Sequence, residues 1–130
     1  MAIESYTSLH TLVSTVCGSL REGVTAMDCV QKCFPPGSMT GAPKRRTMEI
    51  LDRLEQHQPR GVYSGALGFF SFNGASDLSV VIRTAVLQGN TITVGAGGAV
   101  VALSDPLEEY EEMILKASSV APTIFELISS

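Results

Sequence analysis

The sequence is poor in charge, and it has neither a long apolar run nor a block of basic residues. Charged residues make up 17% of its 130 residues, against 45% hydrophobic residues, and the net charge is −4. Without a basic block, the chain lacks the electrostatic footprint of a nucleic-acid-binding protein. It also lacks a run long enough to span a bilayer and a basic, then apolar, secretory start. We therefore expect a cytoplasmic globular chain with neither nucleic acid nor a membrane as a partner.

Cysteine is scarce and odd in number, with Cys17, Cys29 and Cys33 the three examples. An odd number without a secretory signal indicates free thiols in a reducing compartment. Cys29 and Cys33 are four residues apart on a predicted helix, but no second pair with zinc spacing follows them. Cysteine therefore predicts neither a disulfide framework nor a zinc site.

Local signals predict three helices. Thr25 and Asp28 form a capping box that opens a helix ending near Cys33, and the prolines after Phe34 cannot continue it. Residues 42–56 show helical apolar spacing, with Thr40 placed to cap their first turn. Residues 105–118 begin with Asp105 as the cap and Pro106 at the first helical position.

Runs of β-branched and aromatic residues predict the strands. They cover residues 6–20, 63–72, 78–87, 91–94 and the glycine-rich 95–101. Asn73-Gly74 and Gly89-Asn90 separate such runs and are strong turn signals. Because strands and helices fall into separate blocks, we expect an α+β fold with antiparallel sheets flanked by helices.

The last predicted helix carries the first candidate site. Glu109, Glu112 and Lys116 lie three and four residues apart, so they share one helical face. Two neighbouring carboxylates repel each other, and a Mg²⁺ ion between them would remove that cost while keeping positions for water or substrate. A solvated helix face with a Glu–Lys ion pair is the alternative.

Two glycine-bearing segments are candidate anion sites. Residues 37–44 lead into a helix whose free N–H groups favour negative charge, but Ala42 and Pro43 exclude a nucleotide P-loop. Gly95 to Ala99 fails the dinucleotide fingerprint because Val100 replaces its third glycine. Bare N–H groups could still bind an oxyanion there. A plain turn and a tight strand bend are the alternatives.

Two side chains are candidates for carboxylate binding. Arg83 lies within an apolar predicted strand, where an arginine is either on the solvent face or forms a carboxylate fork. Tyr63 begins a predicted strand and has a hydroxyl to donate, although a packed tyrosine is the usual case. Together the candidates suggest a small, multiply negative ligand.

Six motifs then occur in an order that resembles the C-terminal signature of the chorismate-binding enzymes. They are Pro36–Lys44, Met48–Ile50, Arg60–Gly68, Ile82–Ala85, Gly95–Gly98, and Glu109–Glu112 followed by Lys116-Ala117. The resemblance covers residues 6–117 and implies the C-terminal portion of a chorismate-binding domain, of the anthranilate synthase component I type, over residues 1–130. The family includes anthranilate, aminodeoxychorismate, isochorismate and salicylate synthases.

The resemblance implies a role for each candidate residue. Glu112 resembles a Mg²⁺ ligand, with Glu109 a direct or water-mediated second ligand. Arg83 and Tyr63 resemble the pair that binds the pyruvyl carboxylate, assisted by N–H groups of the segment Gly97-Gly98-Ala99. Lys116 resembles a lysine near the metal and carboxylates, and Thr40 matches the loop that lines the pocket; these two are the predicted catalytic residues.

Within the family, Ser38-Met-Thr-Gly, Gly97-Gly-Ala-Val and Glu112-Met look most like aminodeoxychorismate synthases. That resemblance implies Mg²⁺-dependent replacement of a chorismate ring hydroxyl by ammonia, on the route through para-aminobenzoate to folate. A glutamine amidotransferase subunit supplying the ammonia is the implied partner. Anthranilate synthase component I and a salicylate or isochorismate synthase are alternatives.

The family's other Mg²⁺ glutamate and a ring-attacking lysine lie upstream of this stretch. We therefore expect the isolated chain to be a fragment that is inactive alone, and a non-catalytic remnant domain is a further alternative. A partial sheet exposes an edge, which favours self-association into a homodimer.

Overall fold

The computed structural model describes residues 1–129 and the side chains of residues 1–126. Within them the helices are α1 (Ala26–Cys33), α2 (Gly37–Thr40), α3 (Lys44–Leu54), α4 (Pro106–Ser118) and α5 (Ala121–Ser129). The strands are β1 (Ala2–Ser5), β2 (His10–Val13), β3 (Ala66–Phe70), β4 (Ser76–Val80), β5 (Ala85–Gln88) and β6 (Thr91–Val94). Mixed helices and antiparallel strands agree with the predicted α+β class.

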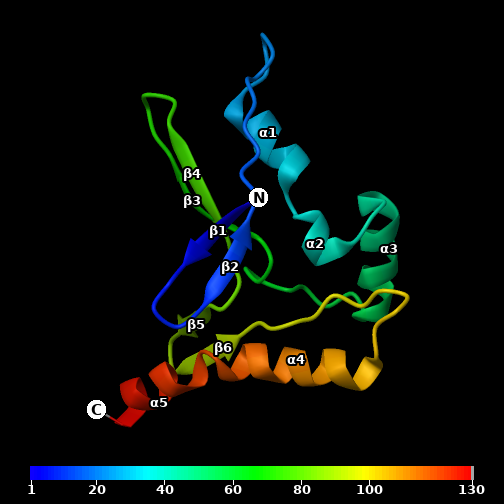
Figure 1. Cartoon of the computed structure of the whole chain (residues 1–130), viewed down its shortest axis with the longest axis vertical. Coiled ribbons are helices and arrows are strands. Elements are labelled where there is room, and N and C mark those ends of the chain that lie inside the picture. The colour runs from blue at the N-terminus through cyan, green and yellow to red at the C-terminus, as the bar shows by residue number, and fades with distance from the viewer. Residues whose placement is uncertain (130) are drawn as a thin grey trace.

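The described strands form separate two-stranded antiparallel sheets, each a hairpin: β1 with β2, β3 with β4, and β5 with β6. Asn73-Gly74 and Gly89-Asn90 lie at the turns of the second and third hairpins, as predicted. Figure 1 shows the hairpins spread apart, with α4 running along one side of the molecule. The hairpins are therefore not stacked into layers.

Several predicted strands differ from those observed. Residues 6–20 contain only β2, because the chain turns at residues 6–9 to pair β1 with β2. Residues 78–87 are not one strand, since a bend at Arg83 separates β4 from β5. Residues 95–101 form no strand, because β6 ends at Val94 and no neighbouring strand pairs with the segment after it.

The predicted helices are largely confirmed. Thr25 and Asp28 form the capping box of α1, in which the Thr25 N–H donates to the Asp28 carboxylate (2.9 Å) and the Asp28 N–H to the Thr25 hydroxyl (3.2 Å). The Thr25 hydroxyl also donates to the Asp28 carboxylate at 2.6 Å, and this bond, followed by the one from the Thr25 N–H, lowers the pKa of Asp28. Thr40 does not cap α3, because it lies in α2 and Pro43 precedes α3 without a side-chain cap.

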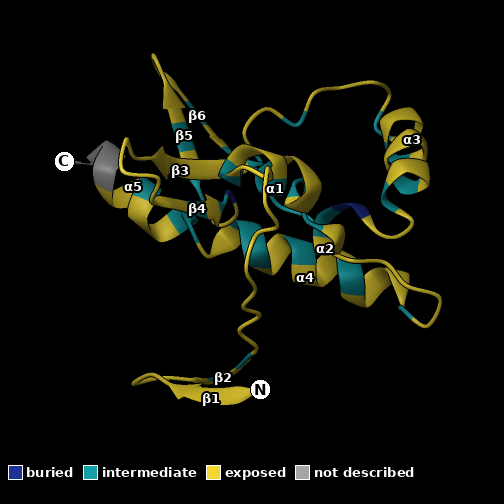
Figure 2. Cartoon of the chain, turned by 90° about the horizontal axis from the view of Figure 1, so that it is seen from above, coloured by how far each residue is buried: buried dark blue, intermediate teal, exposed yellow. Residues whose placement is uncertain are grey.

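Very little of the chain is buried. Val81 is the only buried hydrophobic residue in the described part of the chain, and Thr40 and Ser64 are the buried polar ones. The accessible area is 10957 Å². A compact monomer of this mass would expose about 6,600 Å². Figure 2 shows the resulting predominance of exposed residues, with intermediate ones gathered on the inner faces of α4 and the neighbouring segments.

This exposure predicts that the purified chain binds the dye ANS strongly and melts over a broad temperature range. Exposed apolar side chains such as Leu67, Phe69 and Phe72 can bind the dye. Because few side chains are packed together, little packing is lost cooperatively on heating, and the transition is broad. The measurement is ANS fluorescence and circular dichroism during heating, beside a compact monomer of similar mass. A sharp transition without dye binding would contradict the expectation.

No helix within residues 1–129 has the length and apolar character that crossing a membrane requires. The three cysteines are free, as predicted.

Candidate functional site

The helix α4 carries three of the predicted site residues, and its start is fixed locally. The Asp105 carboxylate accepts hydrogen bonds from the N–H groups of Leu107 (2.8 Å) and Glu108 (3.1 Å), and Pro106 occupies the first turn. Asp105 therefore satisfies two N–H groups that no helical carbonyl can reach. The predicted cap and first turn are both confirmed.

Glu112 and Lys116 form an ion pair one turn apart on α4, with 2.8 Å between Lys116 Nζ and Glu112 Oε1. The hydrogen bond from Lys116 lowers the pKa of Glu112, and the charges of Lys116 and Arg83 act in the same direction. Glu112 is therefore held as a carboxylate. The Lys116 side chain is only 25% exposed, so most of it is covered by neighbouring residues.

Glu109 faces the glycine-rich segment that crosses above α4. Its carboxylate accepts a hydrogen bond from the Ser104 hydroxyl at 2.6 Å, and the Val101 N–H donates to that hydroxyl at 3.0 Å. A Cβ atom on Gly98 would lie 3.2 Å from Glu109 Oε2. Ser104 therefore ties Glu109 to the loop before α4, a contact that the sequence did not predict.

The two carboxylates suit Mg²⁺ in part. They offer hard oxygen ligands from one helical face, and Mg²⁺ is commonly held by one or two carboxylates together with water and substrate. Among the described residues, no group of three His, Cys, Asp or Glu side chains could hold a metal ion. Among the described residues, the donors present therefore fit part of a Mg²⁺ site and not a complete one.

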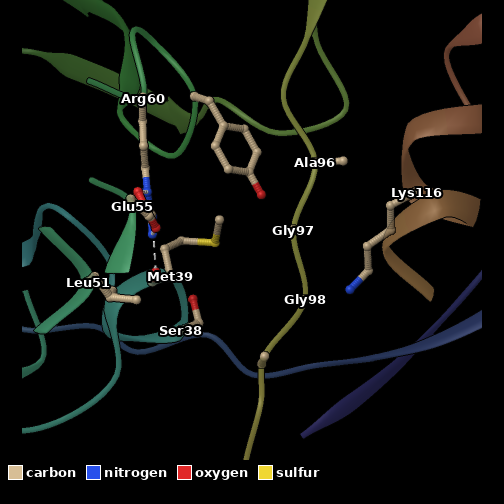
Figure 3. Close-up of a pocket in the computed structure, with 11 residues that line it drawn as sticks. Ser38, Met39, Leu51, Glu55, Arg60, Ala96, Gly97, Gly98 and Lys116 are labelled. Carbon is tan, nitrogen blue, oxygen red and sulfur yellow. Dashed lines mark hydrogen bonds and ion pairs between the residues drawn. The ribbon is translucent and has the colours of Figure 1, made fainter. Parts of the chain in front are cut away.

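Tyr63 and the glycine-rich segment form one wall of a cavity of about 420 Å³. The residues of this segment that line the cavity include Gly97, Gly98 and Ala99, and Lys116 of α4 lines it as well. Figure 3 shows Gly97 and Gly98 of the glycine-rich segment between Arg60 on one side and Lys116 of α4 on the other. In the described part of the chain, the N–H groups of residues 97–99 donate no hydrogen bond to the protein. They are thus available to a negatively charged ligand.

The glycines let the Tyr63 ring approach the backbone. A Cβ atom on Gly95 would lie 2.5 Å from Cγ and Cδ2 of Tyr63, and one on Gly97 would lie 2.9 Å from its hydroxyl oxygen. Real Cβ atoms essentially never come this close. Gly95 and Gly97 therefore lack a side chain at the two positions where the tyrosine ring lies against the backbone.

Arg83 lies near the same wall, in a bend and not in the strand that the sequence predicts. It has a positive φ of +50° between β4 and β5. The bend turns the chain from one hairpin to the next, and Arg83 Nη1 donates to the Ser119 hydroxyl at 3.3 Å. Arg83 lines one small cavity with Tyr63, Gly97 and Lys116, and another with Glu112 and Lys116.

Thr40 is the predicted site residue that lies apart from this wall. It is buried, its hydroxyl donates to the Pro36 carbonyl at 3.3 Å, and it lines a different cavity beside Glu55 and Arg60. The preceding residues form the short helix α2 rather than an open anion-binding loop. Lys44 Nζ donates to the Lys32 and Cys33 carbonyls.

Arg60 and Glu55 also line the main cavity, and the sequence predicted a role for neither of them. The pair raises the pKa of Arg60 and lowers the pKa of Glu55, chiefly through their hydrogen bonds. The five-residue spacing crosses the end of α3, so it is not the i,i+4 pattern that reveals ion pairs on a helix.

The family model of the chorismate binding enzymes matches residues 1–122. A protein of Oryza sativa subsp. japonica named "Probable aminodeoxychorismate synthase, chloroplastic" is 58% identical over 95% of this chain and 13% of its own length. The "Aminodeoxychorismate synthase" of Streptomyces griseus is 59% identical over 89% of this chain and 16% of its own. The "Anthranilate synthase component 1" of Pseudomonas putida is 50% identical over 89% of this chain and 23% of its own. The chain thus spans less than a quarter of the length of each of these relatives.

Proposed function

Because the chain belongs to the chorismate binding enzyme family, we propose that it forms the C-terminal portion of the chorismate-binding domain of an aminodeoxychorismate synthase. The main support from the structure is the wall made by Tyr63, residues 97–99 and Lys116, which presents a hydroxyl, free N–H groups and a cation to one cavity. In the proposed whole protein, further strands of the family's antiparallel sheets cover the exposed hairpins.

In the proposed reaction, this wall binds chorismate through its carboxylates. The N–H groups of residues 97–99 and the Tyr63 hydroxyl donate to the oxygens of the pyruvyl carboxylate. Arg83, whose guanidinium makes a single bond to Ser119 in the described residues, has donors left for a bidentate contact with the pyruvyl carboxylate. Lys116 supplies positive charge near the metal and the carboxylates.

Glu112 and Glu109 are the residues that would hold Mg²⁺. The ion, when bound, draws negative charge to the ring carboxylate and assists departure of the ring hydroxyl. Lys116 lowers the pKa of Glu112 and so keeps it a carboxylate, and Ser104 orients Glu109 by donating to one of its oxygens. The partial donor set agrees with a protein in which this segment supplies one side of the metal site.

Ammonia is the proposed second substrate, supplied by a glutamine amidotransferase partner. Ammonia forms the new carbon–nitrogen bond, the ring hydroxyl departs as water, and 4-amino-4-deoxychorismate results. Two relatives that carry the aminodeoxychorismate synthase name are 58% and 59% identical to this chain. Two relatives named anthranilate synthase component 1 are 50% and 47% identical to this chain, so anthranilate formation is the second candidate.

The test is a chimera in which the complete chain replaces the matching segment of the Streptomyces griseus relative. We expect the chimera to form aminodeoxychorismate from chorismate, ammonia and Mg²⁺, and the chain alone to form none, because its described residues offer only part of the metal site. Liquid chromatography of the products is the measurement. Anthranilate as the product would favour the second candidate, and a folded but inactive chimera would favour a non-catalytic remnant. Product from the chain alone would contradict the partial-site view.

A further inference from the structure

We propose that Arg60 is a positioning residue that holds the Tyr63 ring against the glycine-rich segment, through the turn that carries Tyr63. The expected effect of Arg60 on chorismate binding rests on the function proposed above. The structural role of Arg60 in holding the ring does not. The family resemblance places Arg60 within a motif and assigns it no role.

One guanidinium joins three separate parts of the chain. Arg60 Nε donates to Glu55 Oε2 at 2.9 Å, and Nη2 donates to Glu55 Oε1, so the pair is bidentate. Nη1 donates to the Met39 carbonyl at 3.3 Å and to the Ser64 hydroxyl at 3.4 Å. Arg60 thus links α2, the end of α3 and the turn at residues 61–64.

The turn at residues 61–64 has positive φ angles at both of its ends, and the angle at Ser64 is unfavourable. Gly61 and Ser64 both have φ of +63°, which is costly for serine because its Cβ crowds the backbone. Ser64 is 5% exposed, and its N–H donates to the Val81 carbonyl at 2.9 Å. Such a conformation persists only where neighbours fix it, and Arg60 and Val81 are those neighbours.

Tyr63 lies inside this turn, next to Ser64. Its ring fits against Gly95 and Gly97 with no space for a Cβ atom at either position. A small rotation of the turn would therefore lift the ring from the segment and move its hydroxyl away from the N–H groups of residues 97–99.

Arg60 is poorly suited to bind the substrate directly, although it lines the cavity. Glu55 already neutralises it with a bidentate carboxylate, and each of its three nitrogen atoms has a protein acceptor. Arg83, with its single bond to Ser119 among the described residues, is the more available guanidinium. The role left to Arg60 is to fix the turn.

The first test is fluorine NMR of the complete chain labelled with fluorotyrosine, because the sequence has only three tyrosines. The Tyr63→Phe variant identifies the Tyr63 signal. We expect Arg60→Lys, which keeps the charge but loses the fork, to shift or broaden that signal and to leave those of Tyr6 and Tyr110 unchanged. Arg45→Ala is the control, because the Arg45 side chain is 96% exposed on α3.

An unchanged Tyr63 signal in Arg60→Lys would overturn the proposal. An equal change in all three signals would also overturn it, because that change reports general unfolding. So would a Tyr63 signal in the unsubstituted chain with the chemical shift of an unfolded peptide. None of these outcomes depends on catalysis, so an inactive chimera would refute the proposed function without deciding the role of Arg60.

The second test is a double-mutant cycle in the chimera. We expect Arg60→Lys to raise KM for chorismate about tenfold when Tyr63 is present. In the Tyr63→Phe background, the same substitution should raise KM less than about twofold, because effects that act through one residue are not additive. Equal effects of Arg60→Lys in both backgrounds would show that Arg60 acts independently of Tyr63. A loss of folded protein with an unchanged KM would show a purely structural role; either result would overturn the proposal.

Discussion

Replacing Glu112 with glutamine in the chimera is expected to reduce Mg²⁺-dependent turnover by about 10²- to 10³-fold, the range seen when one stabilising group is removed from an active site. Glutamine keeps the size of the side chain but removes the negative charge that binds a hard cation. Lys116 would also lose its carboxylate partner, leaving unbalanced positive charge beside Arg83. Product formation measured over a range of Mg²⁺ concentrations is the readout.

Glu111→Gln is the matched control, because it removes the same charge from the adjacent position of the same helix. Glu111 is exposed and lies outside the face shared by Glu112 and Lys116. Its replacement should leave turnover and the Mg²⁺ requirement unchanged. Full activity in Glu112→Gln would remove the metal assignment, and an equal loss in Glu111→Gln would point to net charge rather than to ligation.

The elements that sequence predicts well here are those whose determinants lie within one turn of the chain. The Thr25–Asp28 capping box and the Asp105-Pro106 start each satisfy their own helix and need no distant partner. The Asn73-Gly74 and Gly89-Asn90 turns are equally local. The shared helical face of Glu109, Glu112 and Lys116 is predictable for the same reason, because it depends only on spacing within one helix.

The errors concern residues placed by distant contacts. Arg83 occurs in an apolar run that reads as one strand, but the chain bends there to begin a second hairpin. Tyr63 lies in a turn closed by Arg60 and Val81 rather than at the start of a strand. The contact of Glu55 with Arg60 crosses the end of α3, where no helical periodicity could reveal it.

Gly95→Ala is expected to raise KM for chorismate in the chimera by about tenfold or more, the effect of about 1–3 kcal/mol of overpacking. The new Cβ would lie 2.5 Å from Cγ and 2.7 Å from Cβ of Tyr63. These atoms are close to the backbone, so the ring cannot swing aside without moving the turn that carries it. The KM for chorismate and the thermal midpoint, measured on the same preparations, separate loss of binding from loss of folding.

Gly18→Ala is the control for this substitution, because a Cβ there would meet nothing within 4 Å and the glycine has no positive φ. Normal chorismate binding by Gly95→Ala would mean that the ring can leave the glycine-rich segment at no cost. Tyr63 would then not be held where the free N–H groups lie, and the carboxylate would have to rely on Arg83 and Lys116. A raised KM with an unchanged thermal midpoint has the opposite meaning, because it would show that the closeness of the ring to Gly95 serves the ligand rather than the fold.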